Sequence, residues 1–228
     1  MPSLPLCDVA AEMPAKRSRR KDARPAELLA SALDLFVDKG FAATRVEEVA
    51  TRAGVSKGTL FLYFPSKEEL FKAVVRENIS GRLSEWSAEL DGYTGSSSDL
   101  LSYCLTSWWE RVGSTRASGI PKLMMSEGGN FPELAAFYQR EVVEPGDALI
   151  RRILQRGVDS GEFRAMDMRH ASYLVLAPML FLTMAIHSCG PWAEPASGLN
   201  PQYFIALQVD VLLNGLRAAP LRPTPIPT

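Results

Sequence analysis

The hydrogen-bonding side chains of greatest chemical interest in this 228-residue chain lie in one short stretch, residues 57–64. Lys57, Thr59 and Tyr63 supply amine and hydroxyl donors within two helical turns, and Gly58 between them has no side chain. Such donors bond to phosphate oxygens and to the edges of bases, and a glycine lets a backbone approach closely. The chemistry that these residues can perform is therefore recognition of nucleic acid.

Two short helices joined by a turn are needed to position these side chains. Thr44 and Glu47 have the spacing of a capping box at the start of the first helix, which Gly54 ends. Ser56 caps the second helix, and Pro65 closes it because the residue before a proline disfavours the α region. Isolated helices in water need roughly 12–15 residues, so the second helix must be held by a scaffold and used for its surface.

Residues 45–64 thus have the pattern of a helix-turn-helix motif, whose second helix enters the major groove of DNA. The alternative, from the residues alone, is an ordinary helical hairpin inside a bundle.

The same region resembles a known family. Residues 53–64 (AGVSKGTLFLYF) and 66–70 (SKEEL) resemble the DNA-binding signature of TetR-type transcriptional regulators, as do residues 32–36 (ALDLF), Gly40, Phe41 and Thr44 before them. The resemblance covers about residues 22–82. It implies a ligand-responsive regulator that binds palindromic operator DNA as a homodimer in the cytoplasm, and that is not an enzyme.

The resemblance also assigns roles to individual positions. The residues that it places against the major groove are Lys57, Gly58, Thr59, Leu60 and Tyr63. The residues that it places against phosphates are Thr44, Arg45, Ser56 and Lys67. Family members often carry Tyr-Tyr-His where this chain has Phe61-Leu62-Tyr63, so two hydroxyl groups are missing, and Leu62 would instead touch a thymine methyl group.

The chain predicts an all-α protein with an N-terminal three-helix helix-turn-helix domain, residues 22–82, and a C-terminal helical ligand-binding and dimerisation domain, residues 83–219. Residues 1–21 form a disordered leader with a basic run that is either a solvated tail or an arm along DNA. The first helix is expected to begin at Pro25, and residues 220–228 form a proline-rich disordered tail.

One long amphipathic helix from Lys67 to about residue 90 is expected to belong to both domains and to link them. In the second domain, Pro145 removes a helical hydrogen bond and predicts a kink. Asp167 caps a helix that runs to about residue 188, and Asn200 caps the last helix.

The last two helices, residues 167–188 and 201–217, carry more apolar surface than one chain can cover. We expect them to pair with their copies as a four-helix bundle, since closed twofold dimers are the commonest oligomers. The alternative is that both helices pack within the protomer.

Large adaptable side chains in the second domain predict an apolar pocket for a small molecule, because methionine and aromatic residues line such pockets as well as plain cores. They are Trp108, Trp109, Met124, Met125, Phe137, Tyr138 and Met179. Arg111, Glu127 and Gln139 are candidate polar contacts.

Other kinds of site find little support. Cys7, Cys104 and Cys189 are odd in number and widely spaced, and His170 and His187 have no nucleophile or carboxylate at a catalytic spacing. We therefore expect no metal, no cofactor and no enzymatic activity. No run of 18 apolar residues is present, so no membrane span is expected.

The function that these patterns favour is a repressor released from its operator by a small apolar or aromatic effector. An activator, or a regulator without a ligand, would have the same sequence features. A helical enzyme or a small-molecule or lipid carrier with an unused helix-turn-helix is a more distant alternative.

Overall fold

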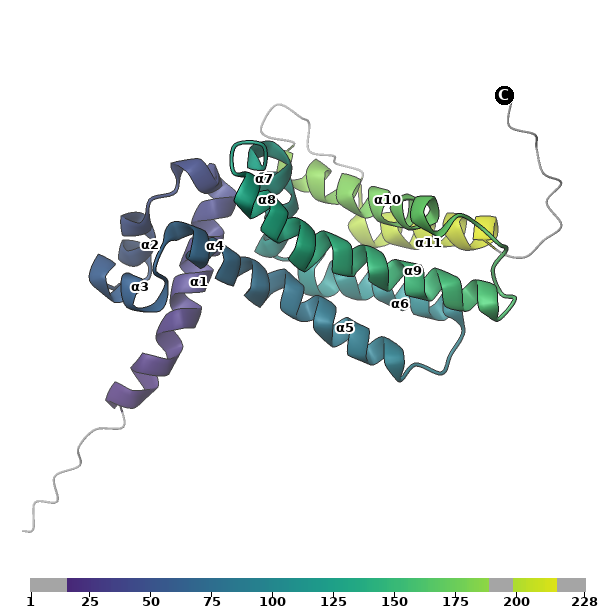
Figure 1. Cartoon of the computed structure of the whole chain (residues 1–228), viewed down its shortest axis with the longest axis horizontal. Coiled ribbons are helices and arrows are strands. Elements are labelled where there is room, and N and C mark those ends of the chain that lie inside the picture. The colour runs from purple at the N-terminus through teal and green to yellow at the C-terminus, as the bar shows by residue number, and fades with distance from the viewer. Residues whose placement is uncertain (1–15, 189–198, 217–228) are drawn as a thin grey trace, which may run out of the picture.

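The computed structural model describes residues 16–188 and 199–216, and within them every regular element is helical (Figure 1). This confirms the predicted all-α class. The N-terminal module contains α1 (Lys16–Ala43), α2 (Val46–Arg52), α3 (Lys57–Tyr63) and α4 (Lys67–Val75). The regulatory part contains α5 (Gly81–Asp91), α6 (Ser97–Trp108), α7 (Gly119–Glu127), α8 (Pro132–Tyr138), α9 (Glu144–Asp159), α10 (Met168–Ser188) and α11 (Pro201–Leu216).

The module with α2 and α3 lies at one end of the molecule, and α10 and α11 lie along the other end, on the side of α6 and α9 away from α5 (Figure 1). Helix α4 leads from the module into the bundle. The two predicted regions therefore meet along α1, α4 and α7.

Helix α1 begins earlier than expected. It starts at Lys16, so Pro25 lies inside the helix and the basic run forms its first turns, where the sequence predicted a disordered leader to residue 21. Residues 1–15 of that predicted leader and the predicted tail lie outside the described residues. Near its other end α1 is broken at Gly40, whose φ of 84° and ψ of 167° suit glycine and few other residues.

The turn between α2 and α3 follows the predicted chemistry. Gly54 has a φ of 67°, and Val55 N–H donates to Ala50 O at 2.9 Å, which are the features of a Schellman motif. Ser56 Oγ accepts from Thr59 N–H at 3.0 Å and so caps α3. This fixes the direction in which α3 leaves the turn.

The predicted capping box at Thr44 is wrong. Helix α2 begins at Val46 with Arg45 as its N-cap residue, which makes no side-chain capping bond. The hydroxyl group of Thr44 turns inward and donates to Leu35 O at 3.1 Å and to Gly40 O at 2.7 Å. The broken end of α1 takes this hydroxyl because its carbonyl groups need donors.

The core of the module is aromatic. The rings of Phe36, Phe41 and Phe71 lie with centroids 5.3–5.6 Å apart, and all three side chains are buried. Phe131, from the loop before α8, packs its ring edge on Phe41 at 4.8 Å. The hydrophobic core therefore continues from the module into the regulatory part.

The long linking helix is not regular. A π turn, Arg76–Ser80, separates α4 from α5, and a second π turn, Gln139–Val143, separates α8 from α9 just before Pro145. The proline was predicted to kink its helix, and the wider π turn is how the chain accommodates the missing N–H group. A third π turn, Trp109–Gly113, follows α6.

Helix caps also organise the end of the regulatory part. Asp167 Oδ1 accepts from His170 N–H at 3.0 Å, and Asn200 Oδ1 accepts from Tyr203 N–H at 3.0 Å. Both predicted N-caps are therefore confirmed, and they set the start of the two helices α10 and α11.

Helices α10 and α11 expose apolar faces within the single chain. The exposed large apolar side chains of α10 are Tyr173, Leu174, Leu180, Phe181 and Ile186, and those of α11 are Tyr203, Leu207 and Val211. They recur every three or four residues, so each set occupies one face. The stretch Met168–His187 is long and apolar enough to cross a membrane, but it packs on α7 and α9 as part of the bundle.

Candidate nucleic-acid interface and ligand cavities

Helix α3 presents an exposed face at the end of the molecule. Lys57 and Gly58 are exposed, and Leu62 is 83% exposed, which is unusual for a leucine. Thr59 and Tyr63 are half-buried, with Thr59 Oγ1 2.8 Å from Ser56 Oγ. The structure thus brings most of the predicted groove-facing residues to one surface, together with an apolar side chain that could contact a thymine methyl group.

Three predicted DNA contacts are wrong for the side chains concerned. Leu60 is fully buried and anchors α3 on the core, and Thr44 is buried with both of its hydrogen bonds inside the module. The ammonium group of Lys67 donates to Phe41 O at 2.8 Å and to Thr44 O at 3.1 Å, and it lies 4.4 Å from the ring centroid of Phe41. Lys67 therefore neutralises carbonyl groups at the end of α1, where it was expected to hold a phosphate.

The basic residues of the exposed surface are paired with acidic neighbours. Lys57 Nζ lies 2.5 Å from Glu47 Oε1, and Lys39 Nζ lies 2.9 Å from Glu48 Oε1. The hydrogen bond from Lys57 lowers the pKa of Glu47, and the one from Lys39 lowers the pKa of Glu48. A phosphate must therefore compete with a carboxylate for each of these ammonium groups, which favours a phosphate held by several donors at once.

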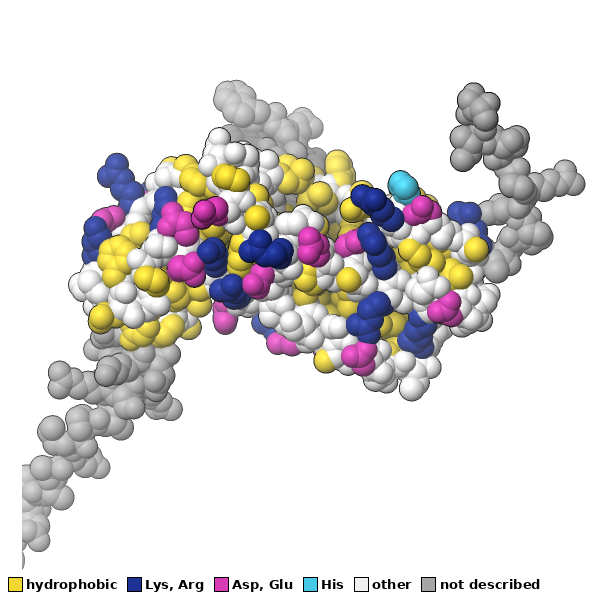
Figure 2. Space-filling view, in the orientation of Figure 1, with side chains coloured by type: hydrophobic (Ala, Val, Ile, Leu, Met, Phe, Trp, Pro, Cys, Tyr) yellow, Lys and Arg dark blue, Asp and Glu magenta, His cyan; other side chains and the backbone are white. Residues whose placement is uncertain are grey.

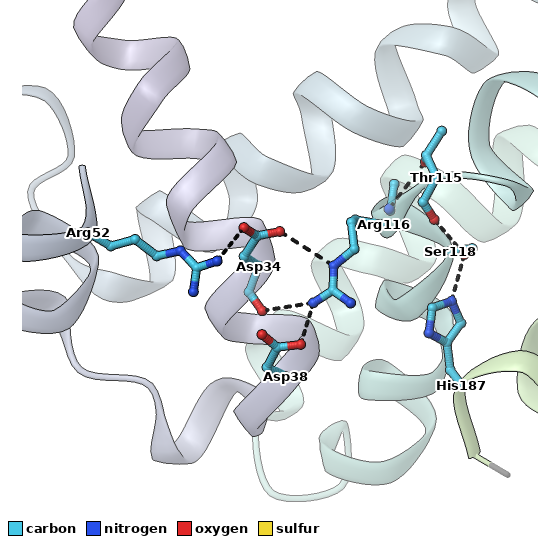
Figure 3. Close-up of polar contacts among 8 residues, drawn as sticks. Asp34, Asp38, Arg52, Thr115, Arg116, Ser118 and His187 are labelled. Carbon is cyan, nitrogen blue, oxygen red and sulfur yellow. Dashed lines mark hydrogen bonds and ion pairs between the residues drawn. The ribbon is translucent and has the colours of Figure 1, made fainter. Parts of the chain in front are cut away.

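Ion pairs connect the module to the regulatory part (Figure 3). Arg52 at the end of α2 donates to Asp34 Oδ2 of α1 at 2.7 Å. On the other side of Asp34, Arg116 Nε lies 3.4 Å from Oδ1, and its Nη2 also donates to Asp38. Arg116 belongs to the short 3₁₀ turn Arg116–Ser118 before α7, so α2, α1 and the regulatory part share one charged network.

The same turn contacts α10. Ser118 Oγ lies 2.6 Å from His187 Nε2, and Lys122 Nζ donates to His187 O at 2.9 Å (Figure 3). Burial lowers the pKa of His187, and the cationic groups of Arg116 and Lys122 lower it further. The contact is therefore made by a neutral imidazole at neutral pH.

A second connection comes from the end of α7. The carboxylate of Glu127 accepts from Phe41 N–H at 3.2 Å and from Ala42 N–H at 2.9 Å. These two amides follow the break at Gly40, so the regulatory part satisfies donors that the broken helix leaves open. Glu127, predicted as a possible ligand contact, instead joins the two regions.

The regulatory part contains an enclosed space that we call the inner cavity. Its volume is about 170 Å³. Its walls are Trp86, Glu89, Leu90, Tyr93, Leu100, Tyr103, Cys104 and Leu149. The indole of Trp86 is buried, and its Nε1–H has no hydrogen-bond partner among the described residues. An unpaired buried donor costs about 1–3 kcal/mol, so the cavity offers a place for an acceptor atom.

Polar side chains lie at one side of the inner cavity. Tyr103 donates its hydroxyl hydrogen to Glu89 Oε2 at 2.8 Å, and Arg111 donates to Glu89 Oε1 at 3.0 Å. Those two hydrogen bonds lower the pKa of Glu89. Arg111 also lies with its guanidinium carbon 5.8 Å from the ring centroid of Trp86.

The predicted pocket residues do not line this space. Trp109, Met124, Phe137 and Met179 are buried in the core, and Met125 is 61% exposed. Neither Trp108 nor Tyr138 is in the wall of the inner cavity. The prediction chose residues by type, whereas the cavity forms where α5, α6 and α9 diverge.

A larger space, the outer cleft, opens between the α4–α5 segment and the α8–α9 segment. Its volume is about 660 Å³. Its walls are Arg76, Ser80, Gly81, Leu83, Ser84, Ser87, Arg140, Glu141, Pro145, Ala148, Leu149 and Arg152. The seven predicted pocket residues are absent from this wall too.

Comparison with known proteins places the chain in a family. Residues 28–74 match the family described as bacterial regulatory proteins, tetR family, and residues 93–189 match the tetracyclin repressor-like C-terminal domain. The transcriptional regulator RutR of Escherichia coli (strain K12) is 52% identical over 62 residues, which are 27% of this chain and 29% of RutR.

Longer matches exist at lower identity. The uncharacterized transcriptional regulator YfiR of Bacillus subtilis (strain 168) is 31% identical over 156 residues, 68% of this chain and 75% of YfiR. Among solved structures, the fatty acid degradation regulator FadR from Bacillus halodurans has a TM-score of 0.66 at 20% identity, covering 85% of this chain and 96% of that one. The latter likeness shows the fold.

Proposed function

The chain belongs to the TetR family of bacterial transcriptional regulators, and from that premise we propose that it is a repressor that binds a palindromic operator as a homodimer and leaves it when a small effector binds. The observation that supports this best is the position of α3. Its exposed face lies at one end of the molecule, and its module is tied to the regulatory part through Arg116 and Glu127.

The proposed DNA contacts are the surface residues of the motif. Arg45 and Ser56 hold phosphates, which positions the module without reading sequence. Lys57, Gly58, Thr59, Leu62 and Tyr63 face the major groove, where the exposed Leu62 meets a thymine methyl group. Because this assembled surface is present without any ligand, we assign the ligand-free state to DNA binding and the liganded state to release.

The proposed dimer uses α10 and α11. Their exposed apolar faces are larger than scattered surface residues would explain, and contiguous apolar patches of this kind mark interaction sites. A second copy with the same two faces would cover both in a four-helix bundle. Two half-sites read together then lie roughly 34–36 Å apart, one turn of DNA. A repressor of this kind would act in the cytoplasm, where the chromosome lies.

The effector site that we propose is the inner cavity. A cavity of about 150 Å³ lined by apolar residues can hold benzene, so a space of about 170 Å³ suits one small ring or a short chain. The unpaired Nε1–H of Trp86 would bond to an acceptor on that ligand. This keeps the expected apolar or aromatic effector and moves its site to other residues.

The coupling route follows from the contacts. A ligand beside Trp86 would bear on α5, which continues through a π turn into α4 of the DNA-binding module. It shifts the population toward a state with wrongly spaced α3 helices if it binds that state more tightly. Coupling of about 1–3 kcal/mol, a 5- to 150-fold loss of operator affinity, is typical.

A gel shift with DNA from upstream of the chain's own gene tests the proposal. We expect Lys57→Ala and Leu62→Ala to abolish the shift while melting temperature and dimer mass stay unchanged. Tyr63→Phe is the fitting change at the third position, because Tyr63 is half-buried and an alanine would also damage the core. Arg82→Gln, on the exposed side of α5, is the matched control for loss of one positive charge.

Normal DNA binding by the Lys57 and Leu62 variants would refute the assignment of α3. A chain that stays monomeric at micromolar concentration would refute the proposed dimer.

A further inference from the structure

The outer cleft combines three guanidinium groups with one carboxylate in its wall: Arg76, Arg140 and Arg152 against Glu141. In the same orientation as Figure 1, Figure 2 shows basic and acidic side chains crowded together over the region where α4, α8 and α9 meet. Few clefts in a protein of net charge −1 carry such an excess of positive charge. The volume of about 660 Å³ is within the usual range of small-molecule sites, about 300–1,000 Å³.

The three arginines differ in how they are engaged. Arg76 donates to both carboxylate oxygens of Glu141, with Nη2 3.1 Å from Oε1. Arg152 donates to Ser87 Oγ at 2.9 Å and pairs with Asp91. Arg140 is exposed and has no hydrogen-bond or ion-pair partner among the described residues. The cleft thus holds guanidinium donors that its own carboxylate does not saturate.

The remainder of the wall is small or apolar. Gly81 leaves room on the α5 side, and Leu83, Ala148 and Leu149 provide an apolar strip. Leu149 also belongs to the wall of the inner cavity, so one side chain separates the two spaces. The outer cleft is therefore suited to a molecule with a charged end and an apolar end.

We propose that the outer cleft binds an anionic amphiphile, an organic phosphate or carboxylate whose head group lies between Arg76, Arg140 and Arg152 and whose short alkyl chain lies along Leu83 and Leu149. Planar guanidinium groups match the oxygen geometry of carboxylates and phosphates, and several together give a strong site. In the ligand-free protein Glu141 occupies Arg76 in place of that head group.

The position of the cleft gives such a ligand a mechanical effect. Arg76 lies in the π turn between α4 and α5, and Glu141 lies in the π turn between α8 and α9. A head group that takes Arg76 from Glu141 opens the ion pair that joins these two turns. This effect on operator affinity rests on the function proposed above, whereas binding in the cleft does not.

Calorimetric titration at 150 mM salt would test the site with octyl phosphate as the probe. We expect octyl phosphate to bind, with 1-octanol and inorganic phosphate each binding at least tenfold more weakly. Arg140→Gln should weaken octyl phosphate binding about tenfold or more, because a hydrogen bond to a charged group contributes about 1.5–3 kcal/mol. Arg82→Gln should leave it unchanged, since Arg82 lies on α5 outside the cleft.

Glu141→Gln supplies a test of opposite sign. It removes the competitor for Arg76 and the like charge near the head group, so octyl phosphate should bind more tightly than to the original protein. Octyl phosphate that binds the Arg140→Gln and Glu141→Gln proteins as it binds the original would overturn the proposal, as would equal binding of 1-octanol.

Octanoate in place of octyl phosphate distinguishes a carboxylate site from a phosphate site. A gel shift on the same samples separates this proposal from the previous one. Octyl phosphate that binds through Arg140 to a protein with no affinity for DNA would uphold the cleft and refute the repressor.

Discussion

The joint between Gly40 and Glu127 yields the sharpest prediction. A Cβ atom built on Gly40 would lie 2.0 Å from Glu127 Oε1, and the glycine has a φ of +84°. Gly40→Ala therefore adds backbone strain and expels the carboxylate that accepts from Phe41 and Ala42. At Gly54, with a φ of +67°, nothing lies within 4 Å of the added atom, so Gly54→Ala is a matched control.

The size of the effect can be worked from these two terms. A residue other than glycine in a sparsely allowed conformation costs about 1–3 kcal/mol. Loss of hydrogen bonds to the charged carboxylate adds about 1.5–3 kcal/mol. We expect Gly40→Ala to lower the free energy of unfolding by about 3–5 kcal/mol and Gly54→Ala by about 1–2 kcal/mol.

Urea unfolding followed by circular dichroism, at one fixed protein concentration because dimer stability depends on it, measures both losses. A double-mutant cycle with Glu127→Ala isolates the clash, since in that background Gly40→Ala should cost only the backbone term. Equal losses for Gly40→Ala and Gly54→Ala, or strict additivity in the cycle, would show that the contact with Glu127 does not hold the joint.

Three further measurements follow from single groups. Lys57→Ala should reduce the slope of log binding constant against log salt by about 0.9, the value for one phosphate, and an unchanged slope would exclude that contact. The pKa of His187 lies below its usual 6.5 in the folded chain, so the unfolded chain binds the extra proton first and stability should fall as the pH drops through 6.5; His187→Gln should flatten this dependence, and equal pH profiles would contradict it. Burial raises the pKa of Cys104 to about 12, so in a Cys7→Ser, Cys189→Ser background a maleimide at pH 8 should label the folded protein far more slowly than the urea-unfolded one, and comparable rates would mean that the thiol is accessible.

The features of the fold that sequence predicted are those set by near neighbours. Ser56, Asp167 and Asn200 cap their helices as expected, because a cap involves residues two or three positions apart. Gly54 adopts a positive φ for the same local reason. The helical class and the approximate helix limits followed from periodicity, which registers the buried face of each helix.

The roles that sequence missed depend on distant parts of the chain. Nothing near Lys67 shows that carbonyl groups 22–26 positions earlier will take its ammonium group, and nothing near Glu127 shows its bonds to Phe41 and Ala42. The cavity around Trp86 likewise exists because three helices diverge there. A tryptophan that continues an apolar stripe looks like ordinary core, so its unpaired N–H group had no sequence signal.

The π turn Arg76–Ser80 has a consequence for any change in chain length there. A π turn holds one residue more than an α turn spanning the same bonds, so deleting one of its five residues would restore a regular helix. Each residue turns an α-helix by about 100°, and every side chain from Gly81 onward would swing through that angle relative to α4. Trp86 would leave the core and the guanidinium at position 76 would lose its partner, so the spare residue keeps the two ends of this helix in phase.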